Sequence, residues 1–304
     1  MEGVMMRNRD KYAVAVRLPD GRVEVKKHDM RHVAEWVLKV PLVRGVFAFI
    51  QSLTMGMSSL MESAEYFEDE EDQKKKQEAS EEEKKKIEKR EKAELSGTLV
   101  LSFIIALALF LALPYGLSKL CERFIESAAL IALIEGVIRV AIFLIYLIAI
   151  SKTEDIKRVF MYHGAEHKCI NCIEAGDELT VENVRKATRF HKRCGTSFLF
   201  VVLLISILVF MFIRVDSRLL QLGLRILLVP LIAGISYEFI RLAGRSENRF
   251  VNLLSQPGLW LQRITTSEPD DEMIEVGIAS VEAVFDWKSF IEGKEQESNK
   301  DCCS

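Results

Sequence analysis

Residues 128–150 read AALIALIEGVIRVAIFLIYLIAI, an apolar run interrupted by only two charges, Glu135 and Arg139. An α-helix of about 20 apolar residues is long enough to cross the hydrocarbon core of a bilayer. Three further stretches of similar length and character follow this pattern: 97–117, 196–213 and 219–240. The sequence therefore predicts an α-helical polytopic membrane protein with about four transmembrane helices.

Lysine and arginine are concentrated on one side of these predicted spans. The connection 151–195 carries nine of them, whereas the short connections 118–127 and 214–218 carry two each. Basic residues gather in cytoplasmic loops of membrane proteins. We therefore expect a multi-pass protein with residues 151–195 and both termini in the cytosol.

The N-terminal segments differ from the spans in their patterning. Residues 12–27 alternate apolar and polar side chains on both sides of a Pro-Asp-Gly sequence, which predicts a small β-hairpin. Residues 33–61 are apolar but are interrupted by Lys39, Pro41, Arg44 and Gly45. This composition favours a re-entrant or interfacial segment over a full span.

Residues 62–95 are almost entirely charged, with acidic and basic blocks at helical spacing, as in EEEKKK. Such pairs can support a long solvated helix, although a flexible charged connector has the same composition. After the last span, residues 250–266 are amphipathic and 268–292 predict a soluble helix. The expected organisation is an N-terminal β-hairpin region (1–32), a re-entrant or interfacial segment (33–61), a charged cytosolic helix (62–95), two transmembrane helices (96–150), a cytosolic His/Cys loop (151–195), two further transmembrane helices (196–241) and a cytosolic amphipathic C-terminal region (242–304).

Four charged residues fall within the predicted spans: Glu135, Arg139, Arg225 and Glu238. A charge at the bilayer centre costs about 2.5–3.5 kcal/mol, so each of them needs a partner. They either pair to hold the helix bundle together or line a polar cavity inside it.

The connection 151–195 contains His-Gly-Ala-Glu-His at 163–167, in the H-x-x-E-H order of a zinc peptidase motif. On a helix His163 and His167 share a face and can bind one zinc ion, while Glu166 can take a proton from water. A catalytic zinc needs a third protein ligand, for which Glu238 is the candidate. The alternatives to it are Glu174 and Asp177.

A second pattern overlaps the first one. Cys169-x-x-Cys172 is followed by His191-x-x-Cys194, a spacing that is typical of a closed, structural zinc ribbon. We favour a mixed site that uses both histidines of the first motif and some of Cys172, His191 and Cys194. Histidines and cysteines that only fill a core, without any metal, remain an open alternative.

Composition excludes some functions. A net charge of −3 is too close to zero for a protein whose main partner is DNA. Six cysteines in 304 residues are too few for a disulfide scaffold.

Seven segments together resemble a family of uncharacterised bacterial polytopic membrane proteins that carries a domain of unknown function and the label "predicted metal-dependent enzyme". The resemblance implies a location in the bacterial cytoplasmic (inner) membrane and a site formed by His163, Glu166, His167, Cys172, His191 and Cys194. The segments are EGVMM (2–6), YHGAEHK (162–168), NC (171–172), LTVENVR (179–185), RCGTSF (193–198), AGISYE (233–238) and PGLWLQRITTSEPDD (257–271).

Two functions remain in competition. The first is a membrane-bound zinc-dependent hydrolase at the cytosolic membrane face, with Glu166 as the general base. The second is a non-catalytic scaffold or membrane-protein biogenesis factor, in which zinc is structural and the charged helix 62–95 binds a cytosolic partner such as the ribosome or a translocase. The lipid bilayer is the expected partner of both, and the sequence leaves a homo-oligomer open.

Overall fold

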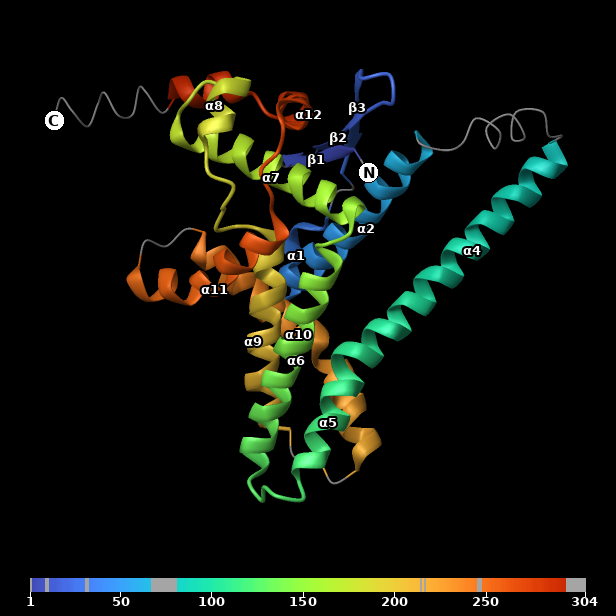
Figure 1. Ribbon diagram of the computed structural model, residues 1–304, viewed down its shortest axis with the longest axis vertical. Helices are drawn as coiled ribbons and strands as arrows, with labels where there is room; N and C mark the ends of the chain where they lie inside the picture. The colour runs from blue at the N-terminus through green and yellow to red at the C-terminus, as the bar shows by residue number, and fades with distance from the viewer. Residues whose placement is uncertain are drawn as a thin grey trace. The chain divides into compact units, whose positions relative to one another are not determined.

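The fold was analysed in a computed structural model, which describes residues 2–8, 11–30, 33–66, 81–213, 215, 217–244 and 248–293. The chain is mostly helical and has one three-stranded antiparallel sheet near the N-terminus (Figure 1). It divides into two compact units. Unit 1 comprises Met1–Tyr66, Leu147–Ile205 and Ile226–Ser304, and unit 2 comprises Phe67–Tyr146 and Ser206–Arg225.

The sheet of unit 1 has the order β1-β2-β3, with β1 at Gly3–Asn8, β2 at Lys11–Arg17 and β3 at Val23–Asp29. The predicted hairpin is confirmed as β2 and β3, whose turn is closed by a 2.8 Å bond from the Leu18 amide to the Arg22 carbonyl. The prediction nevertheless missed one strand of the sheet, because β1 pairs with the other edge of β2. β1 reads GVMMRN, which has no regular polar alternation, so sequence periodicity does not reveal it.

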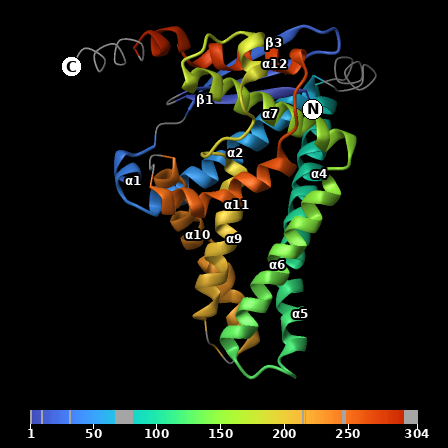
Figure 2. The same cartoon turned by 60° about the vertical axis from the view of Figure 1, so that its left-hand side comes forward.

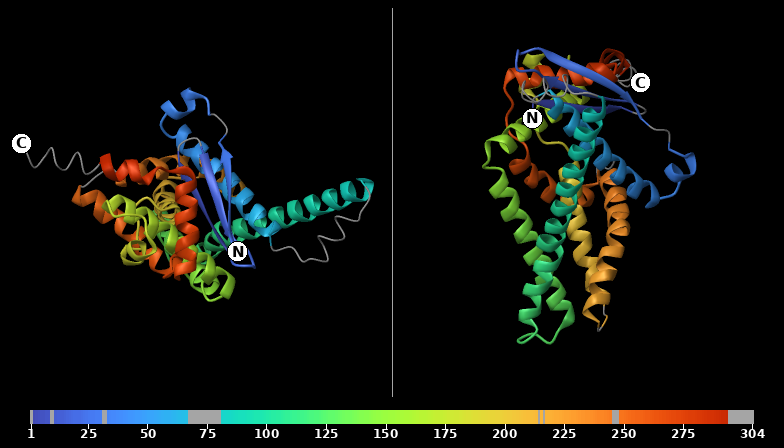
Figure 3. Two further views of the ribbon diagram at one scale, coloured as in Figure 1. Left: turned by 90° about the horizontal axis from the view of Figure 1, so that it is seen from above. Right: turned by 90° about the vertical axis from the view of Figure 1, so that its right-hand side faces the viewer.

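Two helices cover the sheet and form the core of unit 1. They are α7, Glu154–Ala175, and α12, Asp271–Val284; α12 packs on β1 and β2, and α7 packs on α12 and β1 (Figures 2 and 3). Ala13 and Ala15 on β2 are fully buried, and their small side chains leave room for the buried α12 residues. Asp270 caps α12 by accepting a 2.8 Å bond from the Met273 amide, as the acidic helix start predicts.

A short helix, α8, Val181–Lys186, follows α7 and packs on α7 and α12. Thr180 caps it by accepting from the Asn183 amide. It ends at Lys186 because Ala187 is extended, with ψ 155°. The chain from there to Cys194 is therefore free to pass across α7 and supply the side chains of the site.

Residues 33–61 form two helices, α1 at Glu35–Lys39 and α2 at Val43–Glu65. The junction lies against α10 (Arg218–Ala243), where a Cβ added to Gly234 would come within 2.8 Å of the Leu42 carbonyl. Neither helix is among those that are long and apolar enough to cross a membrane. The predicted amphipathic stretch at 250–266 is α11, Arg249–Thr265.

In the described part of the chain, three helical stretches are long and apolar enough to span a bilayer: Ser96–Cys121, Ala129–Ile150 and Leu220–Ala243. The fourth predicted span is α9, Gly195–Met211, an apolar helix of 17 residues. The first stretch combines the end of α4 (Glu81–Leu107) with η1 (Ala108–Ala112) and α5 (Leu113–Cys121), and the second lies in α6 (Ala128–Ile150).

The predicted charged helix is seen only in part. α4 begins at Glu81 and continues without a break into the apolar stretch. Residues 67–80, which belong to the same prediction, lie outside the described residues, as does the end of the C-terminal region, 294–304.

A buried ion cluster joins the helices of unit 2. The Glu135 carboxylate accepts hydrogen bonds from Arg139 on its own helix and from both terminal nitrogens of Arg225 on α10, at 2.5–2.7 Å. Arg139 also donates to the Phe110 carbonyl at 3.0 Å. Pro114, four residues further on, has no N–H for that carbonyl, so the proline in this helix creates the acceptor that Arg139 uses.

Replacing Glu135 by Gln should destabilise the protein strongly. It would leave two buried guanidinium groups without a counter-charge, and breaking a buried pair costs about 3–5 kcal/mol. Thermal unfolding followed by circular dichroism in detergent should show a lower midpoint than for the wild type. Arg90→Gln, which breaks an exposed pair with Glu94, is the control and should leave the midpoint unchanged. Equal midpoints for Glu135→Gln and the wild type would contradict a structural role of the cluster.

Candidate metal centre

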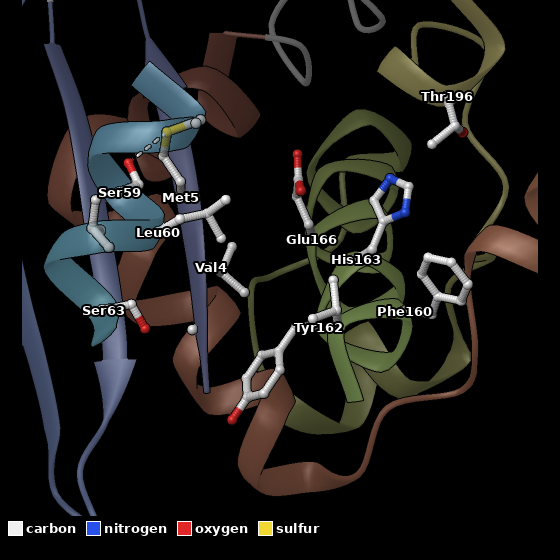
Figure 4. Close-up of a pocket in the computed structure, with 14 residues that line it drawn as sticks. Val4, Met5, Ser59, Leu60, Ser63, Phe160, Tyr162, His163, Glu166 and Thr196 are labelled. Carbon is white, nitrogen blue, oxygen red and sulfur yellow. Dashed lines mark hydrogen bonds between the residues drawn. The ribbon is translucent and has the colours of Figure 1, made fainter. Parts of the chain in front are cut away.

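The H-x-x-E-H motif lies in the middle of α7, so the helix sets its geometry. Figure 4 shows the His163 ring and the Glu166 carboxyl projecting from the same side of this helix. Gly164, between them in sequence, lies directly under the chain that links α11 to α12. A Cβ at this position would be 2.0 Å from the Ser267 carbonyl oxygen, so only glycine allows this close backbone crossing.

Three potential ligands converge beside α7: His163, His167 and Cys194. Their ligand atoms all lie within 4.8 Å of one another, and the His163 Nε2 is 3.2 Å from the Cys194 Sγ. His167 and Cys194 are buried, and His163 is partly buried. The three residues come from the middle of α7 and from the end of the crossing segment after α8.

Backbone carbonyls orient both imidazole rings. The Nδ1 of His163 is 2.8 Å from the Thr265 carbonyl, and the Nδ1 of His167 is 2.7 Å from the Arg189 carbonyl. A carbonyl can only accept, so each Nδ1 carries a proton, and the nitrogen left to bind a metal is Nε2, whose lone pair becomes available when the ring is neutral. This arrangement, with the second ring nitrogen held by a carbonyl, is common for histidines that bind metals.

The charges of the three groups depend on one another. Burial raises the pKa of the Cys194 thiol, but hydrogen bonds and charge from His163 and His167 outweigh this and bring that pKa to about 5. Burial likewise opposes protonation of His163, but the Cys194 contact dominates and raises the His163 pKa to about 9. The Thr196 amide and hydroxyl also contact the sulfur, at 3.4 and 3.1 Å. Cys194 is therefore a thiolate at neutral pH, which is the form that binds metals.

Glu166 is not one of the three converging residues. Burial raises the pKa of its carboxyl group, while the neighbouring histidines lower it in part. The donor set of two imidazoles and one thiolate suits zinc, and a catalytic zinc has three protein ligands and one open position. The residues present thus fit a metal with a free carboxylate beside it.

A cavity of about 450 Å³ opens next to His163 and Glu166 (Figure 4). Its opposite wall is formed by β1 and α2, which contribute Val4, Met5 and Leu60. The lining is mostly apolar. Ser63 is a polar exception: its buried hydroxyl has no hydrogen-bond partner among the described residues.

The other predicted ligands lie outside this set of three. The Cys172 thiol is buried against the carbonyls of Asp177 and Glu178, and burial raises its pKa to about 11. The Nε2 of His191 is 3.4 Å from Glu174, one of the two alternative third ligands. Glu238 is bound by Arg44, whose Nε lies 2.6 Å from its Oε1.

The zinc-ribbon arrangement is not assembled. Cys169 is fully buried against α12, where it lies 3.0 Å from the position of a Cβ on Gly277, and its pKa is raised by burial. It therefore fills the core rather than facing Cys194. Sequence reasoning missed the carbonyls of Thr265 and Arg189 and the contacts of Thr196. Every residue has a backbone carbonyl, so residue type does not show which carbonyl will accept a hydrogen bond.

Comparison with known proteins identifies the family. Residues 40–287 match the model of a family described as "Protein of unknown function (DUF1385)". The chain is also 34% identical to the protein YqhQ of Bacillus subtilis (strain 168), which is described as uncharacterised, over 98% of this chain and 94% of that protein. No solved structure matches the chain. The chain belongs to the DUF1385 family, and neither match names an activity.

Replacing Gly164 by Ala should disrupt the centre. The new methyl group would overlap the Ser267 carbonyl, and overpacking of this kind typically costs about 1–3 kcal/mol. The segment around Ser267 would have to move away from α7, and this movement would take the Thr265 carbonyl away from His163. We therefore expect a lower unfolding midpoint and weaker zinc binding. Gly195→Ala, at a position where a Cβ meets nothing within 4 Å, is the matched control. Equal unfolding midpoints and equal zinc binding for the two variants would contradict the close approach of the Ser267 backbone to Gly164.

Proposed function

We propose that this DUF1385 protein is a membrane-bound zinc-dependent hydrolase whose metal is held by His163, His167 and Cys194. The observation that carries the proposal is the convergence of these three ligand atoms within 4.8 Å of one another, beside a carboxylate that is not among them. A closed structural site would use a fourth protein ligand, whereas no fourth ligand atom joins these three among the residues that the structure describes. His163 and Glu166 also line a cavity in which a substrate can lie.

Glu166 is the proposed general base. When bound, zinc would act as a Lewis acid that polarises a substrate carbonyl and acidifies a water molecule. The Glu166 carboxylate takes the proton of that water and passes it to the leaving group. Its raised pKa favours the first step, because a carboxylate with a raised pKa is a stronger base toward the water proton.

The cavity favours a substrate with an apolar body. Most of its lining consists of apolar side chains from β1, α2 and α7, and only a few polar groups interrupt them. The unpartnered Ser63 hydroxyl can bind one polar group of the substrate. Amides or esters of hydrophobic peptides or acyl chains have this chemistry.

The proposed location follows from the neighbouring helices. α7 begins at Glu154, four residues after α6 ends at Ile150, so the site follows closely after a helix able to span a bilayer. With α9 as a fourth, short span, both termini and α7 would lie on the cytosolic side, as the distribution of basic residues indicates. A hydrolase there could take substrates from the inner leaflet.

The Cys194–His163 contact supports a second candidate, a thiol hydrolase without metal. A thiolate 3.2 Å from an imidazole whose other nitrogen is held by a carbonyl has the arrangement of a nucleophile and its base. In that case Cys194 would attack the substrate carbonyl and His163 would protonate the leaving group. Metal content separates the two candidates.

The purified protein should contain about one zinc ion per chain, since a three-ligand site binds a single ion. Plasma mass spectrometry of the detergent-solubilised protein should find the metal lost in His163→Ala and Cys194→Ser. It should be retained in Glu166→Gln, because Glu166 is not a ligand, and in Cys172→Ala, the matched control for Cys194. Zinc loss in Cys172→Ala would favour the ribbon, and wild-type protein that binds no zinc would favour the thiol hydrolase.

Hydrolysis should depend on Glu166 separately from metal binding. Against a panel of amides and esters with apolar acyl groups, Glu166→Gln should lower kcat/KM by at least about 100-fold, the usual contribution of a general base. Glu154→Gln, an exposed carboxylate at the start of the same helix, should leave the rate unchanged. Full activity of Glu166→Gln would rule out this mechanism.

A further inference from the structure

Unit 2 contains a polar cavity that the proposed hydrolase does not use. Its volume is about 640 Å³, and it lies among α5, the start of α6, the connection that follows α9 and the first turns of α10. In the topology expected from the basic residues, these helix ends face away from the cytosol. The walls combine apolar residues with several charged ones, which is unusual for a space within membrane helices.

The inner end of this cavity carries an excess positive charge. In the part of the chain that the structure describes, Arg139 and Arg225 share a single carboxylate, that of Glu135, and all three residues are at most 3% exposed. The faces of Phe210 and Tyr115 lie 4.8–5.2 Å from the guanidinium groups, but aromatic rings carry no net charge. A buried charge without a counter-charge is unfavourable, so binding of an anion at this end of the cavity would be stabilising.

Hydrogen-bond donors are also left over at this end. The Nε of Arg225, which lines the cavity, is buried and has no hydrogen-bond partner in the described part of the chain. Tyr115 donates to the Oε1 of Gln221 at 3.0 Å, which orients the Gln221 amide and leaves its –NH₂ group as a donor. A guanidinium and an amide together form a suitable site for a phosphate or carboxylate group.

The rim of the cavity has the opposite charge. Lys119 is paired with Glu122, and Glu126 adds a further exposed carboxylate. Counting only the described residues that form the cavity wall and the ion cluster behind it, the rim carries one net negative charge and the inner end one net positive charge. A ligand with an anionic and a cationic group matches both ends, whereas a simple anion meets repulsion at the rim.

We propose that this cavity binds a zwitterion, with its phosphate or carboxylate group against Arg225 and its ammonium group at Glu126. The phosphoethanolamine group has this chemistry, either as the headgroup of a phospholipid or as a soluble molecule. Leu120 and Phe124 beside the rim are 64% and 87% exposed, and they provide an apolar surface for acyl chains. The site is independent of the proposed metal centre.

The test is calorimetric titration of the full-length protein in detergent. The probes are dioctanoyl phosphatidylethanolamine, dioctanoyl phosphatidylglycerol and glycerophosphoethanolamine. We expect saturable binding of the ethanolamine lipid at least tenfold tighter than that of the glycerol lipid. Binding of glycerophosphoethanolamine as well would identify the headgroup alone as the ligand, and binding of the lipid alone would show that the acyl chains contribute. Equal binding of the two lipids, or no binding of either ethanolamine compound, would overturn the proposal.

Three variants localise the binding. Arg225→Gln removes the anion contact, and Ala132→Phe fills the cavity while keeping every charge; each should weaken binding of the ethanolamine lipid at least tenfold. Glu126→Gln should reduce the preference for this lipid over the glycerol lipid. Ala141→Phe, at an exposed position of α6 outside the cavity, should bind like the wild type. Wild-type affinity of a folded Ala132→Phe variant would overturn the assignment, even if Arg225→Gln fails to fold.

Discussion

The candidate centre depends on one backbone crossing, where the segment that joins α11 to α12 passes over α7 at Gly164. There the Ser267 amide donates to the Phe160 carbonyl at 2.8 Å, and the Thr265 carbonyl accepts from His163. The next carbonyl, that of Thr266, accepts from the Arg189 guanidinium. The backbone of Arg189 in turn orients His167. A single contact between two polypeptide segments thus fixes the orientation of both imidazole rings and the path of the chain toward Cys194.

This dependence explains which parts of the site could be predicted from the sequence. The helical period alone places His163 and His167 on one face of α7, and in the structure their ligand atoms do lie close together, beside Cys194. Cys194 was one of several cysteines and histidines at metal-ligand spacing, and spacing could not distinguish it from Cys172. Both thiols are buried, and the distinction lies in their partners: Cys172 faces two backbone carbonyls in the core, whereas Cys194 faces His163. Tertiary packing decides which group each thiol contacts, and the spacing of residues in one sequence does not reveal that packing.

The predicted third ligand, Glu238, shows a second limit of prediction from the sequence. Glu238 was predicted from topology, which gives the depth of a residue in the membrane but not its neighbours. In the structure α2 packs on α10, and this contact brings Arg44 to Glu238. The same limit applies to β1, which is held by its pairing with β2, from Gly3 with Val16 to Asn8 with Lys11, and not by its own periodicity. The apolar helices and the hairpin were predictable because their determinants are local.

The charged residues of the predicted spans answer a question that the sequence left open, namely whether such residues hold helices together or line a cavity. In unit 2 they do both. Glu135 joins α6 to α10 through its bonds to Arg225, and Pro114 frees the Phe110 carbonyl to receive Arg139. Yet one carboxylate neutralises only one guanidinium, so the arrangement that stabilises the bundle also leaves a positive charge beside an open space. If stability were the only requirement, one arginine paired with one glutamate would suffice, and the second arginine would add only a desolvation penalty. The excess charge is therefore better explained by a ligand than by packing.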